Sequence, residues 1–148
     1  MSLIDKLQED MKQALKAKDE LRLSTIRLLR SSVSYARIEK GADLTDDEVL
    51  DVISRAAKQR RESVDAAQSA GRLDIAEREN AELEILTEYL PKQLDEAEVE
   101  SIAKEIIAQV GAKDIKDRGK VMNPLMQKIR GKADGKIAST VVEKLLRG

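Results

Sequence analysis

The residues best suited to chemistry lie in the basic segment 117–136, which contains two helix-start patterns built on Gly-Lys. Each Gly-Lys pair follows an aspartate, in Asp117-Arg118-Gly119-Lys120 and in Asp134-Gly135-Lys136, and apolar residues follow at helical spacing. This pattern predicts two helix N-termini capped by the aspartates. A glycine there lets an anion approach backbone N–H groups closely, and a lysine adds positive charge. Phosphate binding is one interpretation, and ordinary turn chemistry with solvated lysines is the other.

The formal net charge of −1 conceals three blocks of different charge. Residues 1–71 contain 13 basic and 13 acidic side chains; residues 72–110 contain 4 and 11, net −7; residues 111–148 contain 10 and 4, net +6. A basic block provides the electrostatic footprint of a nucleic-acid-binding surface. Because the block has no aromatic residue to stack on bases, it favours recognition of a folded RNA by backbone and shape.

The composition excludes several classes of active site. Cysteine and histidine are both absent, which excludes disulfides, zinc sites of the usual kind, and Ser-His-Asp or Cys-His catalysis. Gly131 and Gly135 do not form a P-loop, because the spacing is wrong and no Ser or Thr follows Lys136. We therefore expect a non-catalytic protein with no metal and no cofactor. No apolar run suits a membrane span or a signal peptide, so we expect a soluble, cytoplasmic protein.

Charged helix faces offer further candidates that we interpret as solvated surface. Acidic pairs at helical spacing include Asp74 with Glu77 and Glu79 with Glu82. Two basic sets could meet phosphates, although such sets are more typical of solvated charge. They are Arg27, Arg30, Ser34 and Arg37, and then Arg55, Lys58, Arg60 and Arg61.

Composition and periodicity predict an all-α fold. Only Tyr35 and Tyr89 are aromatic, 37% of the residues are charged, and apolar residues recur at helical spacing. About four helices are expected in an N-terminal domain, 1–90, and three in a small tail domain, 91–148. The expected N-caps are Ser2, Asp19, Thr45, Asp74 or a neighbour, Asp95, Asp117 and Asp134. Pro124 lies inside the sixth expected helix and predicts a kink or a restart at Asn123.

Several of these motifs together resemble the YqeY family, which has kinship with the GatB subunit of the tRNA-dependent amidotransferase. The resemblance rests on residues 88–94 (EYLPKQL), 119–122 (GKVM), 131–135 (GKADG) and the N-terminal run 21–39. It implies an all-helical fold in two parts, with a tail like the one that helps to hold tRNA near its elbow in the amidotransferase. Standalone members are often labelled amidotransferase-like by kinship.

The leading hypothesis is a non-catalytic tRNA-binding accessory protein that contacts the RNA backbone. Its candidate contacts are Arg118, Gly119, Lys120, Lys128, Arg130, Lys132, Gly135 and Lys136. A second hypothesis is a helical interaction module for a tRNA synthetase or an amidotransferase subunit. A third, from family kinship alone, is a carbon-nitrogen ligase with glutamine as amido-N-donor.

Overall fold

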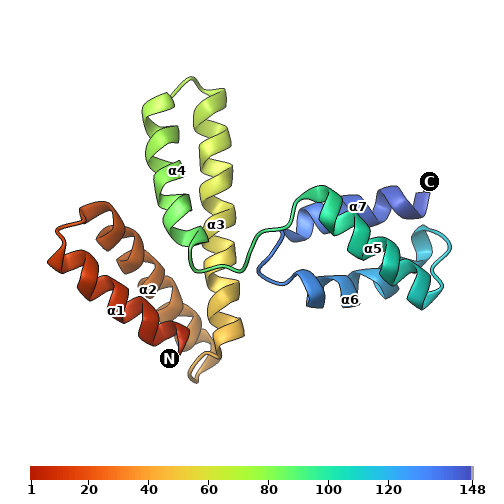
Figure 1. Ribbon diagram of the computed structural model, residues 1–148, viewed down its shortest axis with the longest axis horizontal. Helices are drawn as coiled ribbons and strands as arrows, with labels where there is room; N and C mark the ends of the chain where they lie inside the picture. Colours follow the sequence, from red (N-terminus) through yellow and green to blue (C-terminus); the bar gives the residue numbers. More distant parts are fainter. Residues whose placement is uncertain (148) are drawn as a thin grey trace. The chain divides into compact units, whose positions relative to one another are not determined.

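The computed structural model describes residues 1–147, and the regular structure in that range is helical (Figure 1). The helices are α1 Leu3–Lys16, α2 Glu20–Lys40, α3 Asp46–Ser69, α4 Leu73–Thr87, α5 Glu96–Val110, α6 Arg118–Ile129 and α7 Gly135–Arg147. A short 3-10 turn, η1 Ile115–Asp117, precedes α6. The predicted all-α fold, with four helices followed by three, is confirmed. Within the described residues, none of the helices has both the length and the apolarity that a membrane span requires.

Hydrogen bonds of the capping side chains define where several helices begin. The side chains that accept a bond from the backbone N–H three residues later are those of Ser2, Asp19, Thr45 and Asp95. At Thr45 and Asp95 a glutamate returns the bond and completes a capping box. Gly41 ends α2 with φ 74°, in the left-handed conformation that favours glycine. The predicted N-caps Ser2, Asp19, Thr45 and Asp95 are therefore confirmed. The N-cap of α4 is Arg72, which makes no side-chain cap bond, and Asp74 lies inside the first turn.

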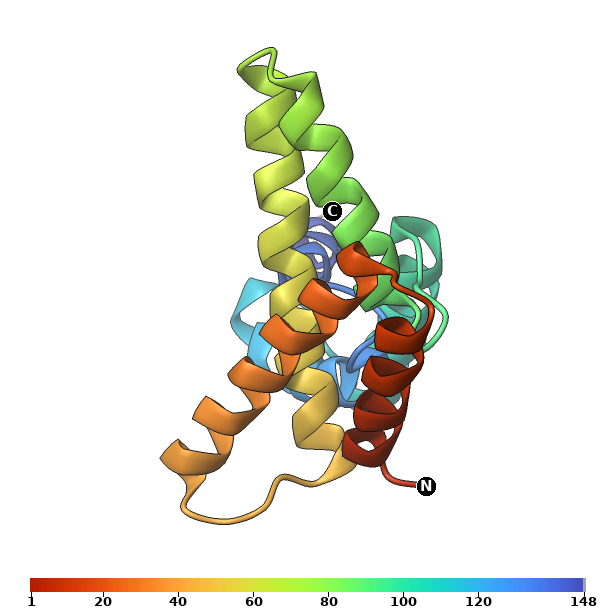
Figure 2. The same cartoon turned by 90° about the vertical axis from the view of Figure 1, so that its left-hand side faces the viewer.

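The chain divides into two compact units, and the first is Met1–Leu90. In this unit α3 and α4 form one long helical hairpin, and α1 and α2 form another (Figures 1 and 2). The hairpins share an apolar core because each helix buries one stripe of its surface. The core comprises Leu7, Leu29, Val33, Val49, Ile53, Ala57, Leu86 and Tyr89.

Tyr89, at the end of the first unit, contacts α1. Its hydroxyl donates a hydrogen bond of 2.6 Å to Asp10 Oδ2, while Lys6 Nζ lies 5.4 Å from the centre of its ring. The phenol is buried, and burial together with the bond to Asp10 raises the pKa of Tyr89. One of the two aromatic side chains therefore belongs to the core.

An ion pair between α3 and α4 corrects the interpretation of one acidic pair as solvated. Glu82 is only 8% exposed, and its Oε2 lies 2.9 Å from Arg60 Nε. Glu79 Oε2 lies 3.5 Å from the same nitrogen. The carboxylates leave solvent because α3 and α4 pack closely along this face and place Arg60 opposite them. Solvated surface was the wrong prediction for Glu82 and Arg60.

The second unit begins at Pro91 and contains α5, α6 and α7, which pack against one another. Its core is separate from that of the first unit and consists of aliphatic side chains from all three helices. The buried members are Val99, Ala103, Ile106, Val121, Leu125, Ile129, Ala138, Val141, Val142 and Leu146. The helices thus form a scaffold that positions the basic residues on their outer surfaces.

Pro124 does not interrupt α6. The helix is continuous from Arg118 to Ile129, so the restart predicted as one outcome at Asn123 is wrong, and the kink, the other outcome, stays a prediction. Proline has no N–H for the carbonyl of Lys120, but Lys120, Pro124 and Lys128 form an i, i+4, i+8 row beside the buried stripe. Both lysines in this row are exposed, so solvent can hydrate the carbonyl. The uninterrupted helix places Lys120 and Lys128 along one side of α6.

Candidate nucleic-acid interface

The connection between α6 and α7 is held by the chain segment that opens the second unit. Gln93 Nε2 donates one hydrogen bond to the carbonyl of Gly131 and another to that of Pro91, each of 2.8 Å. The backbone N–H of Leu94 donates to the carbonyl of Lys132, also over 2.8 Å. Two of these three bonds join segments that are about 38 residues apart in the sequence. The loop that carries Lys132 is thereby fixed.

The fixed loop and its flanks present positive charge. Lys128 at the end of α6, Arg130 and Lys132 in the loop, and Lys136 in the first turn of α7 are all exposed. We call these four residues with Gly135 the turn cluster. All five were predicted from the sequence, and the structure brings them to one end of α6.

Asp134 forms the predicted cap at the start of α7. Its Oδ1 accepts a hydrogen bond of 3.0 Å from the backbone N–H of Lys136. A side-chain carbon placed on Gly135 would lie 3.4 Å from Met126 Cε, so the vacant side of this glycine faces α6. Gly135 therefore serves close packing between two helices, and Lys136 is the residue of this motif that faces solvent.

Asp117 does not form the predicted side-chain cap of α6. Its Oδ2 instead accepts a hydrogen bond of 2.9 Å from the backbone N–H of Lys113, and its Oδ1 lies 3.5 Å from Lys120 Nζ. The bond from Lys113 lowers the pKa of Asp117, and the charge of Lys120 lowers it further. The cap prediction failed because the 3-10 turn leads directly into α6 and turns the carboxylate towards the preceding loop.

Arg118, Gly119 and Lys120 form the other group of predicted residues, which we call the helix-start cluster. Arg118 Nη2 donates to Ser139 Oγ, and its Nε lies 3.4 Å from Glu143 Oε1, so this arginine ties α6 to α7. The Lys120 side chain is 70% exposed. A side-chain carbon on Gly119 would have no neighbour within 4 Å, so the backbone is open there.

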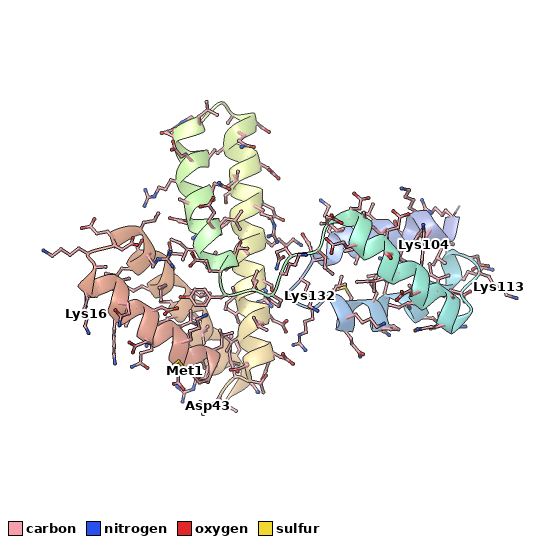
Figure 3. The ribbon with its side chains drawn as sticks, viewed as in Figure 1. Met1, Lys16, Asp43, Lys104, Lys113 and Lys132 are labelled. Carbon is pink, nitrogen blue, oxygen red and sulfur yellow. The ribbon has the colours of Figure 1, made fainter. Side chains whose placement is uncertain are left out.

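The two clusters lie at opposite ends of α6. This helix has 12 residues, and at 1.5 Å per residue it separates them by about 15 Å. In Figure 3 Lys132, a member of the turn cluster, and Lys113, which lies in the loop before α6, are labelled at opposite ends of the second unit. Lys128 belongs to the turn cluster and also to the row that contains Lys120. The predicted residues therefore form two clusters connected along one side of a helix.

The model of the family described as Yqey-like protein matches residues 4–146 of the chain. The chain belongs to the YqeY-like family. The resemblance inferred from its motifs is therefore confirmed. In this YqeY-like protein the bonds of Gln93 and Leu94 bring two of those motifs together, residues 88–94 and residues 131–135.

Several relatives of this YqeY-like protein are fungal proteins named "Altered inheritance of mitochondria protein 41, mitochondrial". The one from Lachancea thermotolerans is 34% identical over 107 residues, which are 70% of this chain and 57% of the relative. The one from Clavispora lusitaniae is 33% identical over 116 residues, 76% of this chain and 67% of the relative. The one from Pyrenophora tritici-repentis is 25% identical over 147 residues, 97% of this chain and 81% of the relative. The chain thus spans little more than half of the Lachancea protein.

Gln93 is the residue of this interface that the sequence did not identify. It lies in the 88–94 motif, and we assigned it no role because its partner Gly131 is distant in the chain. A glutamine immediately after the expected domain boundary is the only sequence signal. That signal does not indicate which loop the amide contacts.

Proposed function

We propose that this YqeY-like protein is a non-catalytic accessory protein that binds tRNA through the backbone phosphates, using the basic surface of its second unit. The main supporting observation is the turn cluster, whose loop is fixed by the bonds of Gln93 and Leu94. A fixed loop presents its cations with little further loss of conformational entropy on binding. The YqeY-like membership supports the same proposal through the kinship described above.

The chemistry of the turn cluster suits phosphate. Lys132 and Lys136 lie near the start of α7. The Asp134 carboxylate already caps that helix end, so the lysine side chains supply the attraction for phosphate. Lys128 continues the positive surface along α6 towards Lys120, since the two lysines belong to one row. This arrangement can follow a phosphate backbone without contacting base edges, so we expect affinity to depend steeply on salt and weakly on sequence.

Two of the predicted contact residues already make interactions within the second unit. Arg118 is engaged with Ser139 and Glu143, and Gly135 faces Met126. We therefore place the principal contacts at the remaining cations, with Gly119 permitting close approach to the backbone. These cations are Lys120, Lys128, Arg130, Lys132 and Lys136.

The decisive experiment compares two double variants with equal loss of charge. Lys132→Ala with Lys136→Ala removes two cations from the turn cluster. Lys113→Ala with Lys116→Ala removes two exposed cations near the other end of the unit. The Kd for a purified tRNA transcript is measured for each variant over a range of salt concentrations. The first double variant should weaken binding by at least ten-fold and lower the salt slope by about one for each lost phosphate contact.

The control variant should stay within about two-fold of the wild type. An equal loss of affinity in both double variants would indicate diffuse attraction to positive charge and would reject the turn cluster. Absence of tRNA binding by the wild type at low salt would reject the proposed function itself. Circular dichroism establishes that both variants remain folded, as expected for exposed lysines.

A further inference from the structure

Helix α2 in the first unit has a long stretch without negative charge. Residues 21–38 contain four arginines and no Asp, Glu or Lys, in a protein with 28 acidic residues among 148. Arg22 is used within the unit, because its Nη1 lies 2.6 Å from Glu88 Oε2. Arg27 lies on the exposed side of the helix, and Arg30 is half-buried beside it. This side of α2 is therefore positively charged, and it faces away from the hydrophobic core.

A surface hollow of about 800 Å³ lies over this part of α2. Its lining includes Arg27, Arg30, Ser34, Tyr35 and Ile38, and Met11 reaches it from α1. Arg30 Nη1 lies 3.0 Å from Met11 Sδ, a contact that holds the guanidinium at the wall of the hollow. The lining contains arginines and hydroxyl groups but no carboxylate.

Tyr35 and Ile38 give the hollow an apolar component that the fold does not use. Their exposed fractions are 74% and 75%, whereas Tyr89, the other aromatic residue, is 8% exposed. The two side chains are three residues apart and so adjacent on one helix face. An exposed aromatic ring beside arginines and serines offers a stacking surface next to donors for phosphate.

A neighbouring hollow on the same helix contains a carboxylate and so differs from the first. It is lined by Ser34, Arg37, Ile38 and Asp43 among others, and Arg37 Nε is paired with Asp43 Oδ1 at 2.8 Å. A carboxylate there neutralises the nearby arginine. Of the two hollows, the first is therefore the one whose lining combines arginines, Arg27 and Arg30, with no carboxylate.

We propose that the hollow on α2 binds unpaired nucleotides of RNA, with one base stacked on Tyr35 and flanking phosphates bound by Arg27 and Arg30. An acidic peptide could also meet the arginines. The combination of an exposed ring, hydroxyl groups and arginine in place of lysine favours nucleotides, since bases stack on aromatic rings and guanidinium groups pair with phosphate in two-point contacts. This site goes beyond the proposed function, because it lies in the first unit and engages bases.

The test uses the full chain and a labelled, unstructured ten-residue oligouridylate at low salt. Tyr35→Ala should weaken binding by about ten-fold, and Tyr35→Phe, which keeps the ring, should stay within about three-fold of the wild type. Arg27→Ala should weaken binding and lower the salt slope by about 0.7. Arg55→Ala, which removes an exposed arginine from α3, is the charge-matched control and should leave the affinity unchanged.

Three results would overturn the inference: no oligouridylate binding by the wild type, equal affinity of Tyr35→Ala and wild type, or tighter binding of a ten-residue glutamate peptide than of the oligonucleotide at the same site. The last result would identify an acidic protein segment as the occupant. The variant with Lys132→Ala and Lys136→Ala keeps the α2 hollow intact and should retain most oligouridylate binding. Oligouridylate binding by the Tyr35→Ala and Arg27→Ala variants tests the α2 hollow. Binding of tRNA by the variant with Lys132→Ala and Lys136→Ala tests the turn cluster, so failure of one proposal is distinguished from failure of the other.

Discussion

Gln93 and Gly131 are joined by a hydrogen bond of 2.8 Å that links the first residues of the second unit to the loop between α6 and α7. The same Nε2 donates to the carbonyl of Pro91. One side chain therefore shapes both the entry into the unit and the loop that carries Lys132. Its removal should affect the fold and the candidate interface together.

Gln93→Ala is expected to destabilise the second unit by about 1–2 kcal/mol, because two part-buried carbonyls lose their donor. Urea unfolding measures this loss, and hydrogen exchange at the amide of Leu94 reports the loosened loop. Gln127→Ala removes an exposed glutamine from α6 and should change stability by less than about 0.5 kcal/mol. Equal stability of the two variants would show that the Gln93 bonds contribute nothing.

Gly119→Ala separates backbone access from stability. The added carbon meets no atom within 4 Å, and alanine favours helix over glycine, so the variant should be more stable by up to about 1 kcal/mol. If a phosphate approaches the backbone at Gly119, the same variant should bind tRNA several-fold more weakly. Thermal unfolding and a tRNA titration measure the two effects. Asn123→Ala, an exposed change one turn later, is the control; unchanged affinity of both variants would remove Gly119 from the interface.

Glu48 provides a prediction for acidic pH. The hydrogen bond from Lys40 Nζ, at 2.5 Å, and that from the backbone N–H of Thr45 lower the pKa of Glu48 from 4.5 to about 2. Because the folded-state pKa is the lower one, this stabilisation is present above about pH 4.5 and is lost as the pH falls towards 2. In Lys40→Ala the pKa of Glu48 should rise towards 4.5, as measured by a carboxyl NMR titration.

Lys12→Ala, an exposed change on α1, serves as the control for this titration and should leave the pKa of Glu48 near 2. A Glu48 that titrates near 2 even without Lys40 would assign the whole shift to the backbone bond of the capping box. The hydrogen bond from Lys40 would then contribute nothing to the pKa of Glu48 or to the stability linked to it.

Arg60→Ala should destabilise the first unit by about 2–3 kcal/mol, because it leaves the carboxylate of Glu82 buried without its main partner. Replacing both members, Arg60→Met with Glu82→Met, should bring stability back to within about 1 kcal/mol of the wild type. Arg55→Ala is the exposed control on the same helix. Denaturant unfolding of the four proteins gives the comparison; a double variant no more stable than Arg60→Ala would contradict this account.

Most helix boundaries could be predicted because their causes are local. Thr45 and Glu48 satisfy each other's backbone groups three residues apart, and Gly41 ends its helix by its own left-handed conformation. Asp117 precedes an apolar helical pattern and was predicted as an N-cap for the same reason, but this prediction is wrong. Because of the 3-10 turn before α6, its carboxylate accepts a hydrogen bond from the backbone N–H of Lys113 instead. Pro124 does not end α6, because the carbonyl of Lys120, which loses its N–H partner, lies beside exposed lysines where solvent can hydrate it.

The sequence by itself determined the all-α fold, the order of four helices and then three, the family, and the concentration of positive charge in the last 38 residues. These features depend on periodicity, capping and composition, which act within a few residues or over whole segments. Only the tertiary structure decided which groups meet across helices. It paired Arg60 with Glu82, turned Arg118 towards Glu143, fixed the loop at Gly131 through Gln93, and divided the predicted cations between the two ends of α6.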